Sequence, residues 1–70
     1  MPIDLQPTSG RKLAQERRDL GLTQEDVAEA LGYKRLTITK WEGRPHISAI
    51  NAERYRRALL RLADEKLATA

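Results

Sequence analysis

The sequence contains no cysteine and a single histidine, His46, among its 70 residues. Neither a disulfide framework nor a zinc site built from Cys and His can therefore stabilise the chain. It also has no apolar run near the roughly 18 residues that a membrane span requires, and no apolar N-terminal segment typical of a secretion signal. These absences predict a cytoplasmic protein that does not contact the membrane and is stabilised by a small apolar core. We expect no metal and no cofactor.

Residues that carry enzymatic chemistry are equally scarce. The sequence has no glycine-rich phosphate-binding loop, no cluster of metal ligands and no plausible pair of nucleophile and base. A chain this short buries only about 60% of its unfolded surface, which leaves little room for an active-site cavity. We therefore do not expect an enzyme, and His46 is better explained as a surface or loop residue.

Positive charge is in moderate excess. Thirteen Lys and Arg against ten Asp and Glu give a formal net charge of +3 and a pI near 9.7. This balance suits a polyanionic partner, although many solvated surfaces carry as much charge. The positions of the basic residues are therefore more informative than their number.

Apolar residues recur at spacings of three and four along most of the chain, which is the pattern of amphipathic helices. The pattern predicts helices over residues 11–20, 24–31 and 35–42, and a long helix that begins at Ser48 or Asn51. There is no strand-like alternation and no internal repeat. We therefore predict an all-α protein, a compact bundle of four or five helices.

The first ten residues lack a helical period and contain prolines and a glycine. We expect residues 1–10 to form a flexible tail, and residues 11–70 to form one domain with a long C-terminal helix. Within that domain, Leu20 is expected to lie on the inward stripe of the first helix. Ile47 and Ile50 are expected to turn inward from the loop that precedes the last helix.

Residues 23–42 hold two short predicted helices joined by a tight turn. Thr23 is a good N-cap, and Asp26, three residues later, completes an Asp variant of the capping box. Gly32 follows the last apolar residue of the first helix, where a chain commonly leaves through a left-handed conformation. The turn then occupies about three residues, which is the layout of a helix-turn-helix.

These residues resemble the lambda-repressor and Cro-like helix-turn-helix family, also called Xre-type, over about residues 11–62. Its members typically read Arg, three residues, Gly-hydrophobic-Thr/Ser-Gln, a helix ending Leu-Gly, and a recognition helix ending Ile-x-x-Trp/Leu-Glu. The chain matches this pattern at Arg17, Gly21, Leu22, Thr23, Gln24, Leu31, Gly32, Ile38, Trp41 and Glu42. The resemblance implies sequence-specific binding of double-stranded DNA, usually as a two-fold dimer on a two-fold operator.

The family's base-facing positions correspond here to Arg35, Leu36, Thr39 and Lys40. Arg35 or Lys40 suits guanine O6 and N7, and Thr39 suits a base edge or a phosphate. Leu36 suits a thymine methyl group, although single exposed leucines are common and need no special explanation.

We also expect residues that contact the DNA backbone. These phosphate candidates are Gln24, Lys34, Thr37, Arg44, Arg11 and Lys12. The resemblance implies Gln24 and Arg44, and charge and position favour the others, with a solvated surface as the alternative for Arg11 and Lys12. Lys34 stands where the family often has a capping Ser or Thr, and a cation there opposes the helix dipole unless a phosphate occupies the helix end. Arg17 and Glu42 match a structural ion pair between the first and third helices.

The last helix leaves two questions open. Its arginines spread around the polar surface and are interpreted as a solvated face. A second apolar stripe with Leu60 and Leu67 indicates either a homodimer interface or a frayed, partly apolar end. The sequence thus predicts a small transcriptional repressor of phage, plasmid or bacterial origin. The alternative is an antitoxin or interaction module of the same fold that binds a partner protein through this helix.

Overall fold

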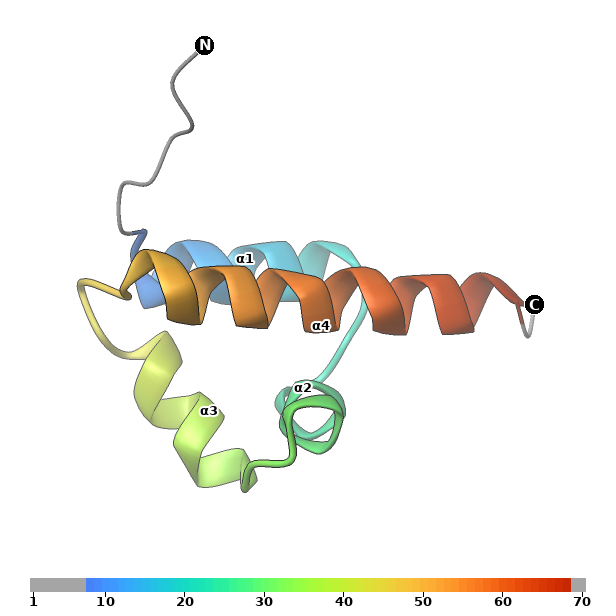
Figure 1. Ribbon diagram of the computed structural model, residues 1–70, viewed down its shortest axis with the longest axis horizontal. Helices are drawn as coiled ribbons and strands as arrows, with labels where there is room; N and C mark the ends of the chain where they lie inside the picture. The colour runs from blue at the N-terminus through green and yellow to red at the C-terminus, as the bar shows by residue number, and fades with distance from the viewer. Residues whose placement is uncertain (1–7, 69–70) are drawn as a thin grey trace, which may run out of the picture.

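The computed structural model describes residues 8–68, which form four α-helices (Figure 1). They are α1 (Gly10–Asp19), α2 (Gln24–Leu31), α3 (Arg35–Glu42) and α4 (Ala49–Ala68). Helices α1 and α2 each pack against both α3 and α4. A short turn connects α2 to α3. Figure 1 shows α4 beside α1, with α2 and α3 together on the other side. The prediction of an all-α helical bundle is confirmed.

The ends of α2 have the predicted capping. The Thr23 hydroxyl accepts from the Asp26 amide at 3.1 Å, and the Asp26 carboxylate accepts from the Thr23 amide at 2.9 Å. This bond from the Thr23 backbone lowers the pKa of Asp26 below its usual value. Gly32 leaves the helix with φ +75°, a conformation that glycine adopts without strain. Together these features fix where the turn into α3 begins.

All four helices contribute to one core. Its largest fully buried side chains are Leu13 from α1, Val27 from α2, Ile38 from α3 and Tyr55 from α4. Ile47, from the loop before α4, is also buried, as predicted. Burial of each large apolar side chain stabilises the fold by about 1.5–3 kcal/mol. One face of α3 is thus packed in the core, and the opposite face of this helix is exposed.

Two predicted core residues are exposed instead. Ile50 is 70% exposed because α4 already begins at Ala49, which places Ile50 about 200° around the helix from buried Ala52. Leu20 is 41% exposed because α1 ends at Asp19 and Leu20 serves as its C-cap at the edge of the core. The predictions for both residues were wrong because they depended on where a helix begins or ends.

Three residues of the predicted tail, residues 8–10, make defined contacts with the rest of the structure. Thr8 pairs with Ile47 through two backbone hydrogen bonds of 3.2 and 2.6 Å, and the Ser9 hydroxyl caps α1 by accepting from the Lys12 amide. Gly10 is the first residue of α1. Residues 8–10 therefore belong to the folded domain, and the tail prediction for residues 1–7 lies outside the described residues.

Gly10 is needed because two helices approach closely at this point. A Cβ atom there would overlap the carbonyl oxygen of Trp41 and come within 2.7 Å of the Glu42 carbonyl carbon. The Gly10 amide also donates to the Arg44 carbonyl at 2.9 Å. The start of α1 is thus fixed against the end of α3, a role that chain flexibility alone does not explain.

The start of α4 is settled by Ser48. Its hydroxyl accepts from the Asn51 amide at 3.3 Å, and its carbonyl accepts from the Ala52 amide at 2.8 Å. Of the two predicted starts, the structure uses Ser48. Among the described residues, no helix combines the length and apolarity needed to cross a membrane.

Candidate nucleic-acid interface

Helix α3 has one buried face and one exposed face. Ile38 is fully buried and Trp41 is only 9% exposed, so both anchor the helix in the core. The four predicted base-contacting residues are all exposed: Arg35, Leu36, Thr39 and Lys40. Leu36 is 63% exposed. The helix therefore presents two long cations, a hydroxyl and an apolar side chain together on its uncovered side.

The N-terminus of α3 has no side-chain cap. Lys34 occupies the N-cap position and makes no capping hydrogen bond, so amides of the first turn remain available to an anion. Arg35 approaches Glu25 at only 4.0 Å, and both side chains are about two-thirds or more exposed. Such an exposed pair contributes little to stability, so Arg35 can leave Glu25 to bind another partner.

The turn before α3 is held by aromatic packing. Tyr33 contacts Trp41 edge-on, with ring centroids 5.5 Å apart and an interplanar angle of 68°. Arg54 from α4 donates to the Tyr33 hydroxyl at 3.3 Å. These contacts fix the direction in which the chain enters α3.

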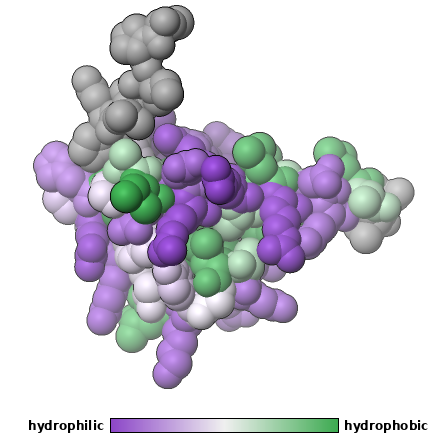
Figure 2. All heavy atoms as spheres, viewed as in Figure 1, coloured by the Kyte–Doolittle hydropathy of each residue, from purple (hydrophilic) through white to green (hydrophobic). Residues whose placement is uncertain are grey.

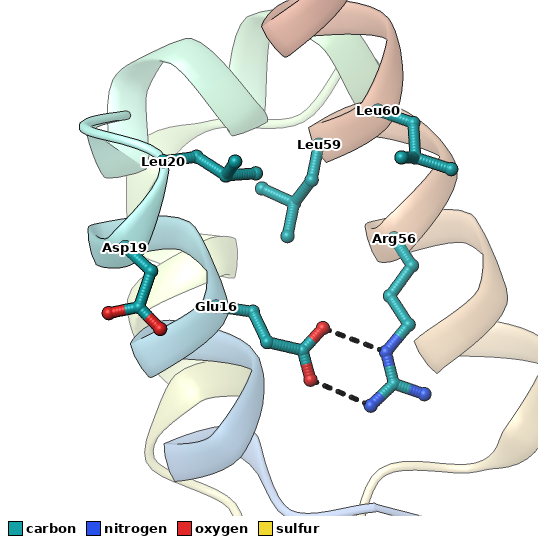
Figure 3. A pocket seen from close by; sticks show the side chains of 6 residues that line it. All are labelled: Glu16, Asp19, Leu20, Arg56, Leu59 and Leu60. Carbon is teal, nitrogen blue, oxygen red and sulfur yellow. Dashed lines mark hydrogen bonds and ion pairs between the residues drawn. The ribbon is translucent and has the colours of Figure 1, made fainter.

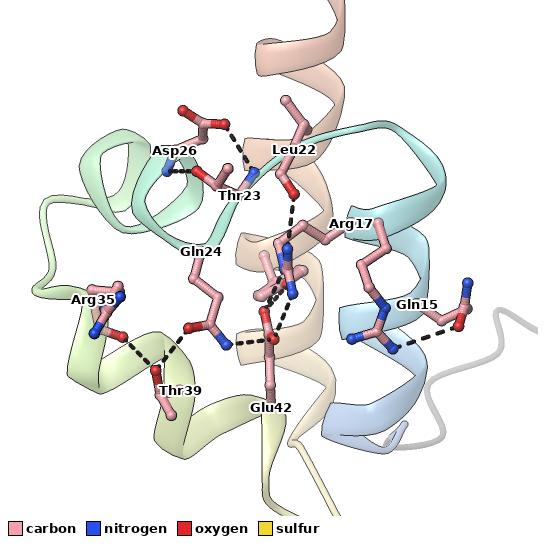
Figure 4. A network of polar contacts seen from close by, with 11 residues as sticks. Gln15, Arg17, Leu22, Thr23, Gln24, Asp26, Arg35, Thr39 and Glu42 are labelled. Atoms are coloured by element: carbon pink, nitrogen blue, oxygen red, sulfur yellow. Dashed lines mark hydrogen bonds and ion pairs between the residues drawn. The ribbon is translucent and has the colours of Figure 1, made fainter.

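Glu42, at the end of α3, is the centre of a polar network (Figure 4). Arg17 donates to both of its carboxylate oxygens, at 2.9 and 3.1 Å, and to the Leu22 carbonyl at 2.8 Å. The Tyr55 hydroxyl donates to Glu42 at 2.5 Å. The ion pair implied by the family resemblance is therefore present and ties α1 to α3, and the bond from Tyr55 adds α4 to the network.

This network keeps Glu42 charged in a largely buried place. Burial alone would raise the pKa of Glu42, but hydrogen bonds from Arg17, Tyr55 and Gln24, with the charge of Arg17, outweigh it and lower that pKa. For Tyr55, burial and the bond to Glu42 raise the pKa well above its usual value. Burial acts to lower the pKa of Arg17, yet its bonds to Glu42 raise it overall. Glu42 is thus an ionised acceptor and Tyr55 a neutral donor.

Gln24 joins this network to the outer face of α3. Its Nε2 donates to Glu42 Oε1 at 3.0 Å, and its Oε1 accepts from the Thr39 hydroxyl at 2.9 Å (Figure 4). Gln24 is partly exposed at the start of α2, beside α3. The link between Gln24 and Thr39 was not predicted, because they lie on different helices and no spacing in the sequence relates them.

The other phosphate candidates lie around α3. Lys34 is exposed and Thr37 partly exposed at its N-terminal end, and Arg44 is exposed in the loop after its C-terminal end. Arg11 and Lys12 are exposed at the start of α1, which the bond from Gly10 to Arg44 places beside that loop. Arg11 and Arg44 both line the hollow there. Cations therefore lie near both ends of α3.

The arginines of α4 have different partners. Arg56 donates to both carboxylate oxygens of Glu16 on α1, at 2.9 and 2.8 Å (Figure 3). Arg57 and Arg61 pair with Glu53 and Glu65 on their own helix. The interpretation as a solvated face therefore misses Arg56, which links α4 to α1.

Exposed apolar side chains also occur on α4. The groove beside Arg56 is lined in part by Leu20, Leu59 and Leu60. Figure 3 shows Leu20 and Leu59 pointing toward each other between α1 and α4. Leu60 is 70% and Leu67 76% exposed. On the face shown in Figure 2, hydrophilic side chains predominate and the apolar ones stand in separate groups. Within residues 8–68, no group of three or more His, Cys, Asp or Glu is placed to hold a metal.

Helix α3 packs on α2 through its buried face, a turn at Gly32 joins the two helices, and the other face of α3 is exposed. This arrangement is that of a helix-turn-helix DNA-binding protein. A family model described as helix-turn-helix matches residues 13–60, more than half of the chain. The chain belongs to this family, the lambda-repressor and Xre-like helix-turn-helix proteins, and is a DNA-binding regulator of that type. Comparison with curated proteins gave no match, and neither did comparison with solved structures.

Proposed function

We propose that the protein is a sequence-specific transcriptional repressor that inserts α3 into the major groove of double-stranded DNA. The observation that best supports this proposal is the exposed face of α3, opposite the buried Ile38 and Trp41. This face carries Arg35, Leu36, Thr39 and Lys40. A major groove about 12 Å wide admits one helix, and its base edges offer partners to each of these side chains. Arg35 or Lys40 binds guanine, and Leu36 packs on a thymine methyl group.

Residues around α3 position it on the DNA backbone. Lys34 and Thr37 meet a phosphate at the uncapped start of α3, and Gln24 contacts one from the start of α2. Arg44, Arg11 and Lys12 contact the backbone at the opposite end. These contacts carry charge and register but little sequence information.

The repressor acts as a homodimer on a two-fold operator. Leu60 and Leu67, both largely exposed, are the interface candidates on α4, and the apolar groove beside Leu60 extends that surface. Two recognition helices in successive major grooves require half-site centres about 34 Å apart. We infer a phage, plasmid or bacterial source, a cytoplasmic location and no enzymatic activity.

A second function rests on the same leucines. Exposed Leu60 and Leu67 also suit a protein partner, as in an antitoxin, in which case DNA binding is secondary or absent. A toxin gene next to the gene for this chain favours that reading, whereas a palindrome upstream of the gene favours the repressor.

Selection from a pool of random DNA duplexes tests the proposal. The purified chain should enrich one motif with two-fold symmetry whose half-sites are about one helical turn apart. Enrichment of no motif, with binding that depends on DNA length alone, would contradict sequence-specific repression.

A further inference from the structure

The hydroxyl of Thr39 has only one proton, and both of its hydrogen bonds point into the protein. Its Oγ1 lies 2.9 Å from Gln24 Oε1 and 3.2 Å from the Arg35 carbonyl oxygen (Figure 4). An amide oxygen and a backbone carbonyl oxygen can only accept. Whichever of the two receives the proton, the exposed side of Thr39 is left with lone pairs alone.

The orientation of the Gln24 amide follows from Glu42. An ionised carboxylate has no proton to donate, so a neighbouring amide must turn its NH2 group toward it. Glu42 already receives bonds from Arg17 and Tyr55, which keep it ionised. Gln24 therefore directs Nε2 at Glu42 and Oε1 at Thr39. The reverse orientation would set two acceptor oxygens against each other.

We propose that the Arg17–Glu42 ion pair, acting through Gln24, makes Thr39 a pure hydrogen-bond acceptor that reads an amino group in the major groove. The amino groups available there are adenine N6 and cytosine N4. Guanine N7 and O6, thymine O4 and phosphate oxygens are all acceptors, so Thr39 does not pair with them. This inference rests on the proposed function and adds a chemical rule for one base of the operator.

Gln24 thereby has two separable roles. One hydrogen of its Nε2 is used by Glu42, and the second remains for a phosphate oxygen. Loss of the phosphate contact weakens binding to all sequences alike. Loss of the bond to Thr39 changes the preference at one base position. Gln24 is therefore a positioning residue for Thr39 as well as a backbone contact.

The first test compares the protein and its Thr39→Val variant on modified DNA. Selection with the chain and with Thr39→Val identifies the base pair whose preference depends on the hydroxyl. At that pair, the amino group is removed by replacing adenine with purine, or cytosine with 2-pyrimidinone. In a second duplex, a 7-deaza purine removes the N7 acceptor instead. Anisotropy titrations then compare each duplex with the unmodified one.

Removal of the amino group should weaken binding about threefold to tenfold, the value of one hydrogen bond. The same removal should have little effect on Thr39→Val. If instead loss of the N7 acceptor costs affinity in a way that depends on Thr39, the proposal is overturned. It is also overturned if Thr39→Val changes no base preference.

The second test isolates Gln24 by a double-mutant cycle. Gln24→Met should weaken all duplexes and also reduce discrimination at the Thr39 position. The hydroxyl then keeps only the Arg35 carbonyl oxygen, at 3.2 Å, as an inward acceptor, so it can more readily turn its proton outward. The double variant Gln24→Met/Thr39→Val should discriminate no less than Thr39→Val alone. Gln15→Met is the matched control, since Gln15 bonds to Asp19 on α1 and has no link to Thr39. It should leave discrimination unchanged.

Independent effects of Gln24 and Thr39 on discrimination would overturn the proposal that Gln24 acts through Thr39. Specific binding that lacks the amino-group dependence would overturn this inference while leaving the repressor proposal standing. Absence of specific binding to any duplex would overturn both.

Discussion

Arg35 and Lys34 are neighbours of equal charge, yet the proposal gives them different roles. Lys34 lies at the N-cap of α3 and Arg35 is its first helical residue. We expect Arg35→Ala to lose about 1–3 kcal/mol of discrimination at one base, as for a guanine contact, without loss of fold. We expect Lys34→Ala to weaken binding uniformly and to reduce the salt slope by about one. Competition binding on matched and singly mutated duplexes measures both, and identical behaviour of the two variants would refute the assignment.

Glu42 makes a prediction about pH. Because its folded-state pKa is below its usual value, the unfolded chain takes up a proton more readily than the folded one. The stabilisation by Glu42 is therefore complete above the unfolded-state pKa and is lost as the pH falls through the lower, folded-state value. Carboxyl-carbon NMR should show Glu42 titrating below the usual glutamate value of 4.5. Titration at or above that value would contradict the network around it.

Single residues show both the reach and the limit of sequence reasoning. The partnership of Arg17 and Glu42 was accessible because both occupy positions of a known pattern. The bond from Tyr55 to Glu42 was not, because Tyr55 appears in the sequence as a member of an apolar stripe and its hydroxyl finds a partner only in three dimensions. The bond between Gln24 and Thr39 was hidden for the same reason.

At the scale of the helices, Gly10 gives the sharpest test. An added methyl group would meet the backbone of Trp41 and Glu42, which cannot move aside as a flexible side chain would. We expect Gly10→Ala to lower the free energy of unfolding by about 1–3 kcal/mol, as for overpacking. Thermal and urea unfolding measure this loss.

Gly43→Ala is the matched control for that substitution. Gly43 has φ −87°, and a Cβ atom there would meet its nearest neighbours at an ordinary 3.6 Å. Its effect should stay within about 0.5 kcal/mol, as for surface changes. Equal losses for the two variants would show that close approach does not explain Gly10.

The ends of helices could be predicted where capping residues mark them in the sequence. Residues 24–31 and 35–42 form helices as predicted, because the Thr23 capping box and Gly32 are local signals. The sequence predicts that the first helix starts after Gly10, because residues 1–10 show no helical period. The contact of Gly10 with α3, which fixes the observed start, is not a local property of the sequence. The predictions that Leu20 and Ile50 lie in the core were wrong for a similar reason, because they depended on the end of α1 and the start of α4.

At the scale of the whole molecule, the proposed dimer depends on α4. Figure 1 shows the C-terminal part of α4 extending beyond the other helices, where Leu67 lies. We expect Leu60→Glu to shift the protein from dimer to monomer in sedimentation velocity and to weaken binding to a two-fold duplex more than to a half-site. The reason is that a charge would be placed in an apolar contact.

Ile50→Glu is the control for the dimer. Ile50 is also 70% exposed and lies on the same helix, near its other end. It should leave the sedimentation coefficient unchanged. A chain that is monomeric on its full operator would contradict the dimer while leaving recognition by α3 intact.

The central claim is that the exposed face of α3 reads duplex DNA by sequence, and fluorescence anisotropy across a range of salt concentrations tests it most directly. The two duplexes are the one from upstream of the chain's own gene and a scrambled version of it. We predict at least about 10³-fold tighter binding to the native duplex, persisting near physiological salt. Equal, salt-sensitive binding to both duplexes, or none to either at low salt, would contradict the claim.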